Sequence, residues 1–231
     1  MNKKIIIFIG NMGSGKSEIA INYTIRMMKE SVKEIRLLDL DIIKPYIRIR
    51  DVSEKIDHLG IKLLMPDERL RNADMPIVPN HMVEYLTDPT YDIVMDIGGE
   101  ERGCITIAQF KDYLEKTDLS VNLVVNPFRP FSDSESKILH MIDSLQNQSK
   151  LSITGLISNP HLRYDTSIEQ VITGTNLVEK VSKATHIPLN FVCIWHKIIT
   201  DDFLSKFTEY KILPLRLYLT FPWENGLMAG L

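Results

Sequence analysis

The sequence has few of the residues and segments that mark secreted, metal-clustered or membrane proteins. It contains two cysteines in 231 residues, Cys104 and Cys193, and they lie far apart. So sparse a pattern indicates neither a disulfide framework nor a zinc site within one chain, and it is typical of a reducing cytoplasm. The apolar run near the start ends at Ile9, and no run approaches the roughly 18 apolar residues of a membrane span. We therefore expect a cytoplasmic protein.

The sequence also lacks blocks of positive charge, internal repeats and low-complexity tracts. Its formal net charge is −3, and no run of five or more basic residues occurs. This gives no signal for nucleic-acid binding. The 44% of hydrophobic residues and 25% of charged residues are enough for one sizeable core. We therefore expect a single domain over residues 1–231.

Short runs rich in Val, Ile and Leu alternate with longer helical patterns along the chain. The expected strands are Lys4–Ile9, Ile35–Leu40, Ile61–Met65, Tyr91–Ile97, Leu119–Val125, Ile153–Ser158, Leu189–Cys193 and Ile212–Leu219. The expected helices are Lys16–Met28, Lys44–His58, Pro79–Thr87, Cys104–Glu115, Ser132–Gln148, Ser167–Thr185 and Asp201–Phe207, with Ser132 and Asp201 as N-caps. Such alternation predicts an α/β fold with a mostly parallel sheet and helices on both faces. The stretch 66–79 reads as a loop or lid.

The strongest motif in the chain is the phosphate-loop pattern G-x-x-x-x-G-K-[ST]. It is formed by Gly10, Asn11, Met12, Gly13, Ser14, Gly15, Lys16 and Ser17. An expected strand precedes the motif and an expected helix follows it, which is the order that a P-loop NTPase requires. In such a loop Lys16 reaches the β- and γ-phosphates and the Ser17 hydroxyl binds Mg²⁺. The alternative is a Gly-rich turn that binds nothing.

Carboxylates follow two of the expected strands, at the edge where a parallel sheet binds ligands. Asp39 and Asp41 end one strand, where they can hold Mg²⁺ or orient a water molecule. Asp96 ends another strand and precedes Gly98 and Gly99, which is the form of a Walker B segment. The alternatives are a helix cap at Asp41 and an ordinary turn after Asp96.

A third strand end carries an amide. Asn159 follows Ile153–Ser158, where its side chain can donate to and accept from the edge of a base. No Asn/Thr-Lys-x-Asp sequence, which reads guanine, follows any expected strand, so adenine is favoured. The alternative is a simple Asn-Pro turn.

Together these motifs resemble the ParA/MinD family of P-loop ATPases, in order over about two thirds of the chain, and look closest to members without an assigned role. The resemblance implies ATP and Mg²⁺ as cofactors, an ATP-dependent homodimer and a protein partner that is not identified. It implies that Asp41 positions the attacking water and helps to bind the metal, with Asp39 as its companion. It also implies that Asp96 is the Walker B aspartate, that Gly99 lies at the γ-phosphate and that Asn159 contacts adenine.

One position departs from the family pattern. The signature lysine that reaches across the dimer is replaced by Asn11, which cannot neutralise the charge that develops during phosphoryl transfer. We therefore expect slow intrinsic hydrolysis. An arginine can substitute for the lysine, and the candidates are Arg48, Arg50, Arg102 and Arg129.

The sequence leaves other functions open. A small-metabolite kinase also carries such a phosphate loop, and a non-hydrolysing ATP sensor is favoured by Asn11. Cys104 follows the Asp96 segment, as a cluster-binding cysteine does in the nitrogenase iron protein, but an ordinary helix-start cysteine is the alternative. The C-terminal stretch with Trp223 makes a poor membrane-binding helix because it carries no lysine or arginine.

Overall fold

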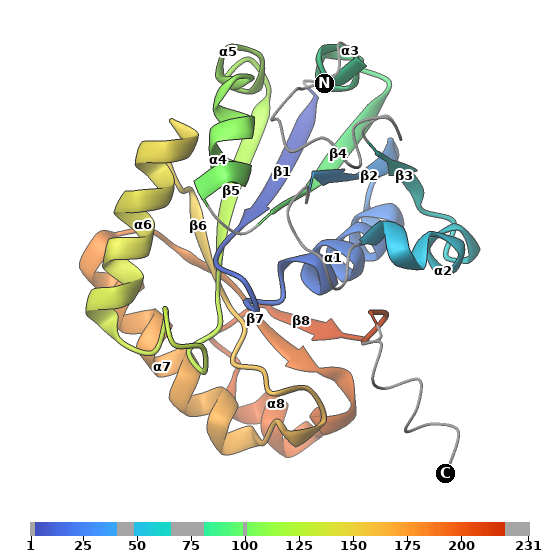
Figure 1. Cartoon of the computed structure of the whole chain (residues 1–231). Coiled ribbons are helices and arrows are strands. Elements are labelled where there is room, and N and C mark those ends of the chain that lie inside the picture. Colours follow the sequence, from blue (N-terminus) through green and yellow to red (C-terminus); the bar gives the residue numbers. More distant parts are fainter. Residues whose placement is uncertain (1–2, 41–48, 66–80, 99–100, 220–231) are drawn as a thin grey trace.

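A computed structural model describes residues 3–40, 49–65, 81–98 and 101–219, and every structural statement below concerns those residues (Figure 1). Several expectations fall outside this part of the chain. They are those for Asp41, Gly99, Arg48, the stretch 66–79 and the C-terminal stretch with Trp223. The side chains of Arg50 and Arg102 also lie outside the description.

The sheet has eight strands in the order β3-β2-β4-β1-β5-β6-β7-β8, and each neighbouring pair is parallel. The strands are β1 (Lys4–Ile9), β2 (Glu34–Leu40), β3 (Lys62–Leu64), β4 (Tyr91–Ile97), β5 (Asp118–Val125), β6 (Gly155–Ser158), β7 (Leu189–Trp195) and β8 (Ile212–Leu215). Because all eight expected strands form and pair in parallel, the predicted α/β class is confirmed. β1 lies inside the sheet between β4 and β5, where the strand order changes direction.

Helices cover both faces of this sheet (Figure 1). They are α1 (Lys16–Glu30), α2 (Ser53–His58), α3 (His81–Thr87), α4 (Glu101–Ala108), α5 (Lys111–Leu114), α6 (Glu135–Ser149), α7 (Ile168–Thr185) and α8 (Asp201–Lys206), with 3₁₀ turns at Ile49–Val52, Arg163–Asp165 and His196–Ile198. One core packs α1 and α2 against the sheet, and another packs α3, α4, α6 and α7 against the opposite face. None of the described helices is long and apolar enough to cross a membrane.

The central strand explains why the sequence shows no polar alternation. Ile5, Ile7 and Ile9 of β1 enter the core under α4 and α6. Ile6 and Phe8 enter the core under α1. A strand that is buried on both faces has no side chain to give to solvent, so it reads as a continuous apolar run.

Two expected helix starts and one expected helix are wrong. Ser134 is the N-cap of α6, and Ser132 instead donates its hydroxyl to the Asn126 carbonyl at 2.6 Å. Thr200 caps α8 by accepting from the Phe203 N–H, so Asp201 is the first helical residue. The expected helix 104–115 is divided into α4 and α5, and the division places the Phe110 side chain in the core.

The last expected strand ends earlier than its apolar pattern indicates. β8 stops at Leu215, whereas Ile212–Leu219 was expected. Beyond Leu215 the backbone bonds to α1 in place of a neighbouring strand. The Asn22 side chain accepts from the Arg216 N–H and donates to the Arg216 carbonyl, both at 2.9 Å. The Asn22 amide thus satisfies the backbone N–H and carbonyl of Arg216, as a neighbouring strand would.

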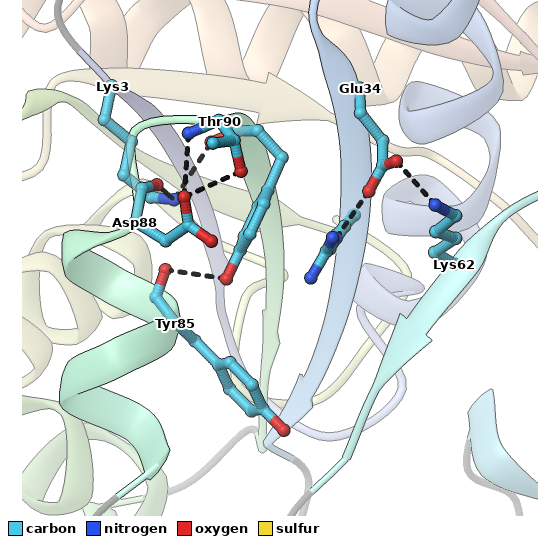
Figure 2. A network of polar contacts seen from close by, with 8 residues as sticks. Lys3, Glu34, Lys62, Tyr85, Asp88 and Thr90 are labelled. Atoms are coloured by element: carbon cyan, nitrogen blue, oxygen red, sulfur yellow. Dashed lines mark hydrogen bonds and ion pairs between the residues drawn. The ribbon is translucent and has the colours of Figure 1, made fainter.

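Polar side chains form hydrogen bonds and ion pairs at the amino ends of several strands of the sheet (Figure 2). Lys3 donates to the carbonyls of Asp88 and Tyr91, while Asp88 accepts from the N–H and hydroxyl of Thr90. Glu34 of β2 forms an ion pair with Lys62 of β3, with 2.6 Å between the Glu34 Oε2 and Lys62 Nζ atoms. These polar groups satisfy one another's hydrogen-bonding capacity, so we assign the amino ends of the strands a structural role. Ligands of a parallel α/β sheet bind at the carboxyl ends of the strands.

Candidate phosphate-binding site

The loop between β1 and α1 has a backbone that glycine alone adopts easily. Gly10, Gly13 and Gly15 have φ angles of 148°, 77° and 90°. The loop is also packed closely. A Cβ atom on Gly10 would lie 2.5 Å from the Val124 carbonyl oxygen, and one on Gly15 would lie 2.3 Å from the Asn159 side-chain nitrogen. Strand ends from β5 and β6 therefore hold the loop in place.

Helix α1 begins directly after this loop, with Gly15 as its N-cap and no side-chain cap. The N–H groups of its first turn are therefore available to an anion, and the helix dipole favours negative charge there. Lys16 is 1% exposed, and its Nζ donates to the Asn11 carbonyl at 3.2 Å. The ammonium group thus lies against the loop that precedes it.

Three buried polar atoms around the loop have no hydrogen-bond partner within the described part of the chain. They are the hydroxyl oxygens of Ser14 and Ser17 and the side-chain oxygen of Asn159. Buried polar atoms of this kind are costly unless a ligand, ion or water satisfies them. A hydroxyl at the start of the helix suits Mg²⁺, and a loop of this form suits phosphate oxygens. The residues present therefore fit a magnesium-bound nucleotide.

Asp39 and Asp96 are opposite each other on neighbouring strands. Their Cα atoms are partners in the β2·β4 ladder, and both residues are fully buried. Leu37 and Val94 precede them by two residues and belong to the core under α1. Because alternate residues share a face of a sheet, the two carboxylates lie on the same side as α1.

The two carboxylates suit a magnesium ion whose other ligands are water molecules and phosphate oxygens. No group of three or more His, Cys, Asp or Glu that could hold a metal occurs among the described residues. Mg²⁺ in nucleotide sites commonly uses only one or two carboxylates with substrate oxygens. Among the described residues, Asp39, Asp96 and the Ser17 hydroxyl are the candidate donors on this face of the sheet.

The predicted base-contacting residue lies against the phosphate loop. Asn159 directly follows β6, and its Nδ2 donates to the Ser14 carbonyl at 2.7 Å. Its role at a base remains a prediction. A second amide was missed: Asn126 follows β5, and its Nδ2 donates to the Gly13 carbonyl at 3.4 Å and the His161 carbonyl at 2.9 Å. The signal was present, because Asn126 ends its strand as Asn159 does.

Glu18 was also missed, although it adjoins Ser17. Its carboxylate accepts from the Tyr218 N–H and, at 3.2 Å, from the Leu219 N–H. Burial raises the pKa of Glu18 to about 7, against the effect of these two bonds. The segment after β8 is therefore attached to the first turn of the helix that follows the loop.

Cys104 has the surroundings of a structural thiol. It is buried within α4, and burial raises its pKa to about 11, with a small opposing effect from Lys16. Cys193 is also buried, inside β7 and not at its end, and burial raises its pKa. Buried thiols of this kind are typical of ordinary structural cysteines, and the cluster hypothesis for Cys104 stays a prediction.

Comparisons with known proteins give fold-level similarity. No family model and no curated protein matches the sequence. Among solved structures, the chain is similar to the signal recognition particle receptor FtsY from Elizabethkingia anophelis, with TM-score 0.57 and 13% identity over 93% of this chain and 62% of that one. It is similar to FtsY from Thermotoga maritima, with TM-score 0.57 and 13% identity over 83% and 62%. Chloroplast FtsY from Physcomitrella patens gives TM-score 0.55 and 16% identity over 83% and 58%.

These structures, together with the parallel sheet and the loop after β1, define the class: the chain has the α/β fold of P-loop NTPases. It spans about three fifths of the length of the FtsY chains that it matches. At these identities the likeness concerns the fold alone.

Proposed function

We propose that the chain is a Mg²⁺-dependent ATPase of the ParA/MinD type that acts as a nucleotide-dependent dimer switch on a protein partner. One observation carries this proposal: Ser17, whose buried hydroxyl has no hydrogen-bond partner among the described residues, follows the glycine-rich loop after β1 and starts α1, on the face of the sheet where Asp39 and Asp96 lie near the ends of their strands. A phosphate site beside a magnesium site is the requirement for phosphoryl transfer.

Each residue of the proposed site has its own role in the reaction. The loop N–H groups and Lys16 hold the phosphates and stabilise charge on their oxygens. Ser17 and Asp96 would hold the magnesium ion, which would supply further positive charge, and Asp39 would lie near the metal as the companion of Asp41. The proposal also includes Asp41, which orients the attacking water, Gly99 at the γ-phosphate and Asn159 at the base.

Adenine is proposed over guanine because no Asn/Thr-Lys-x-Asp sequence follows a strand. The fold relatives are a reason to test the base directly, because one of them, FtsY from Elizabethkingia anophelis, was solved in complex with GDP. Binding assays should therefore compare ATP with GTP.

Sedimentation velocity tests the switch. The purified protein is compared without nucleotide, with Mg·ADP, with Mg·ATP and with a slowly hydrolysed ATP analogue. We expect a dimer only with ATP or its analogue, because the family pattern places nucleotides at the dimer interface. A monomer in all four conditions would contradict the dimer switch.

A non-hydrolysing sensor is the second candidate, and Asn11 favours it because the amide cannot supply the charge of a lysine. Phosphate release separates the two functions. A sensor binds ATP and dimerises without turnover, whereas a switch releases phosphate. A kinase would remain monomeric and transfer the phosphate to a small molecule.

A further inference from the structure

The segment after β5 forms a compact turn against the phosphate loop. The Asn126 side-chain oxygen accepts from the Phe128 N–H at 3.1 Å, and the Asn126 carbonyl accepts from the Arg129 N–H at 3.1 Å. The Ser132 N–H then donates to the Arg129 carbonyl at 3.0 Å, and the buried Ser132 hydroxyl donates to the Asn126 carbonyl. These bonds fix the backbone of Arg129.

Arg129 extends from this turn onto the loop. Its Nε donates to the Gly13 carbonyl at 3.2 Å, beside the bond from the Asn126 amide to the same oxygen. A Cβ atom on Gly13 would lie 3.2 Å from Nε and 3.7 Å from Cζ of Arg129. The guanidinium group therefore lies directly against the face of the loop, at a position where a larger residue would displace it.

The charge of Arg129 is available to a ligand. Among the described residues, the guanidinium group makes one hydrogen bond, from Nε, and no carboxylate there forms an ion pair with it. The two terminal nitrogens keep four N–H donors in a planar arrangement that suits phosphate oxygens. The side chain is half-buried, which strengthens such an interaction relative to a fully solvated one.

We propose that Arg129 contacts the terminal phosphate of the bound nucleotide from within the same chain, and so supplies the positive charge that Asn11 lacks. This inference rests on the proposed function. Lys16 lies against Asn11 at one point of the loop and Arg129 lies against Gly13 at another, so two cations flank the loop. The phosphate with the most negative charge, the terminal one, is stabilised most by such an arrangement.

The affinities for two nucleotides, one with the terminal phosphate and one without it, test this contact. Dissociation constants are measured by calorimetry for a slowly hydrolysed ATP analogue and for ADP, each with Mg²⁺, on the wild type and on Arg129→Ala. We expect the analogue to bind about tenfold to a hundredfold more weakly to the variant, as loss of a charged hydrogen bond implies. ADP, which lacks the terminal phosphate, should bind within about twofold of the wild-type value. Arg26→Ala, at an exposed pair on α1, is the matched control.

A second variant separates charge from bracing of the loop. Arg129→Gln keeps a donor for the Gly13 carbonyl but carries no charge, and it serves also if Arg129→Ala fails to fold. We expect it to lose the preference for the analogue over ADP, and we expect Asn11→Lys in the same chain to restore that preference. Equal weakening for both nucleotides would overturn the inference in favour of a bracing role.

The result for the wild type distinguishes the two proposals. A wild type that binds the analogue tightly, with an Arg129→Gln variant that binds it equally well, would overturn the role of Arg129 alone. A wild type that binds neither ATP nor GTP would overturn the proposed function together with this inference.

Discussion

Single residues around the phosphate loop are set by their neighbours as much as by the loop itself. Gly15 has room for no side chain because a Cβ there would lie 2.3 Å from the Asn159 side-chain nitrogen, and Gly13 has little room because Arg129 lies over it. The positive φ angles alone would favour glycine or asparagine at both positions. Tertiary contacts thus add a second reason for glycine, and they connect β5 and β6 to the loop.

His161 provides a prediction about pH at this scale. Burial lowers its pKa to about 4, with smaller effects from Arg163 and Arg129, and its Nδ1 lies 3.1 Å from the Thr166 hydroxyl. Because the unfolded chain binds a proton near pH 6.5 and the folded chain does not until about pH 4, the free energy of unfolding falls as the pH falls through this window. The loss is about 1.4 kcal/mol per pH unit, up to about 3 kcal/mol.

Urea unfolding of the wild type and His161→Gln, at about pH 7 and about pH 5, measures this effect. We expect the wild type to lose stability relative to the variant at the lower pH, because glutamine has no proton to bind. Substitution of the exposed His140 on α6 is the control for the loss of a histidine as such. A wild type and His161→Gln that respond identically to pH would contradict the prediction.

Among the elements, α1 has two tasks, because it follows the phosphate loop and it also holds the segment after β8. Glu18 and Asn22 lie one turn apart and together bond the backbone of residues 216–219. Glu18 directly follows Ser17 in the chain. The first turn of α1 therefore adjoins the phosphate site and also bonds to this segment. An apolar pattern such as Ile212–Leu219 cannot show where a strand ends when the next partner is a side chain.

Asn22→Ala tests this attachment. The substitution leaves the N–H and carbonyl of Arg216 without the partners that they have in the structure, and we expect a loss of about 1–3 kcal/mol in the free energy of unfolding. Hydrogen exchange measures the local effect. The amides of Arg216, Tyr218 and Leu219 should exchange faster, while that of Val192 in β7 should not.

Thr87→Ala removes an exposed hydroxyl bond at the end of α3 and is the control for this experiment. It should leave the exchange of residues 216–219 as in the wild type. Unchanged exchange at Arg216 in Asn22→Ala would show that Asn22 does not hold the segment.

For the whole molecule, the local sequence pattern was sufficient to predict the strands and the place of the loop motif, although not every helix start or strand end. Buried runs of Val, Ile and Leu gave the eight strands, and the loop motif between β1 and α1 was confirmed in its place. The sequence could not show that Asp39 and Asp96 are register partners, because strand order is set by long-range packing. It listed Arg129 among four candidate arginines but could not show that Arg129 lies on Gly13. The choice of Ser132 as a cap failed because a nearby turn uses its hydroxyl.

Assembly provides the prediction at this scale. Asn11→Lys introduces the charge that the ParA/MinD pattern has at this position, so under the proposed function we expect stronger dimerisation with Mg·ATP or faster phosphate release. Sedimentation velocity and a phosphate-release assay measure the two effects. Val32→Lys adds the same charge at an exposed turn after α1 and should change neither. No change in Asn11→Lys would show that a lysine here reaches no phosphate.

The central claim is that the loop after β1 binds a nucleoside triphosphate with magnesium. Calorimetric titration of the wild type and Lys16→Ala with Mg·ATP and with Mg·GTP tests it most directly, with Lys29→Ala at the exposed end of α1 as control. We predict that the wild type and the control bind ATP more tightly than GTP, and that Lys16→Ala weakens binding about a hundredfold or more. Equal affinity in Lys16→Ala and the wild type would contradict the account.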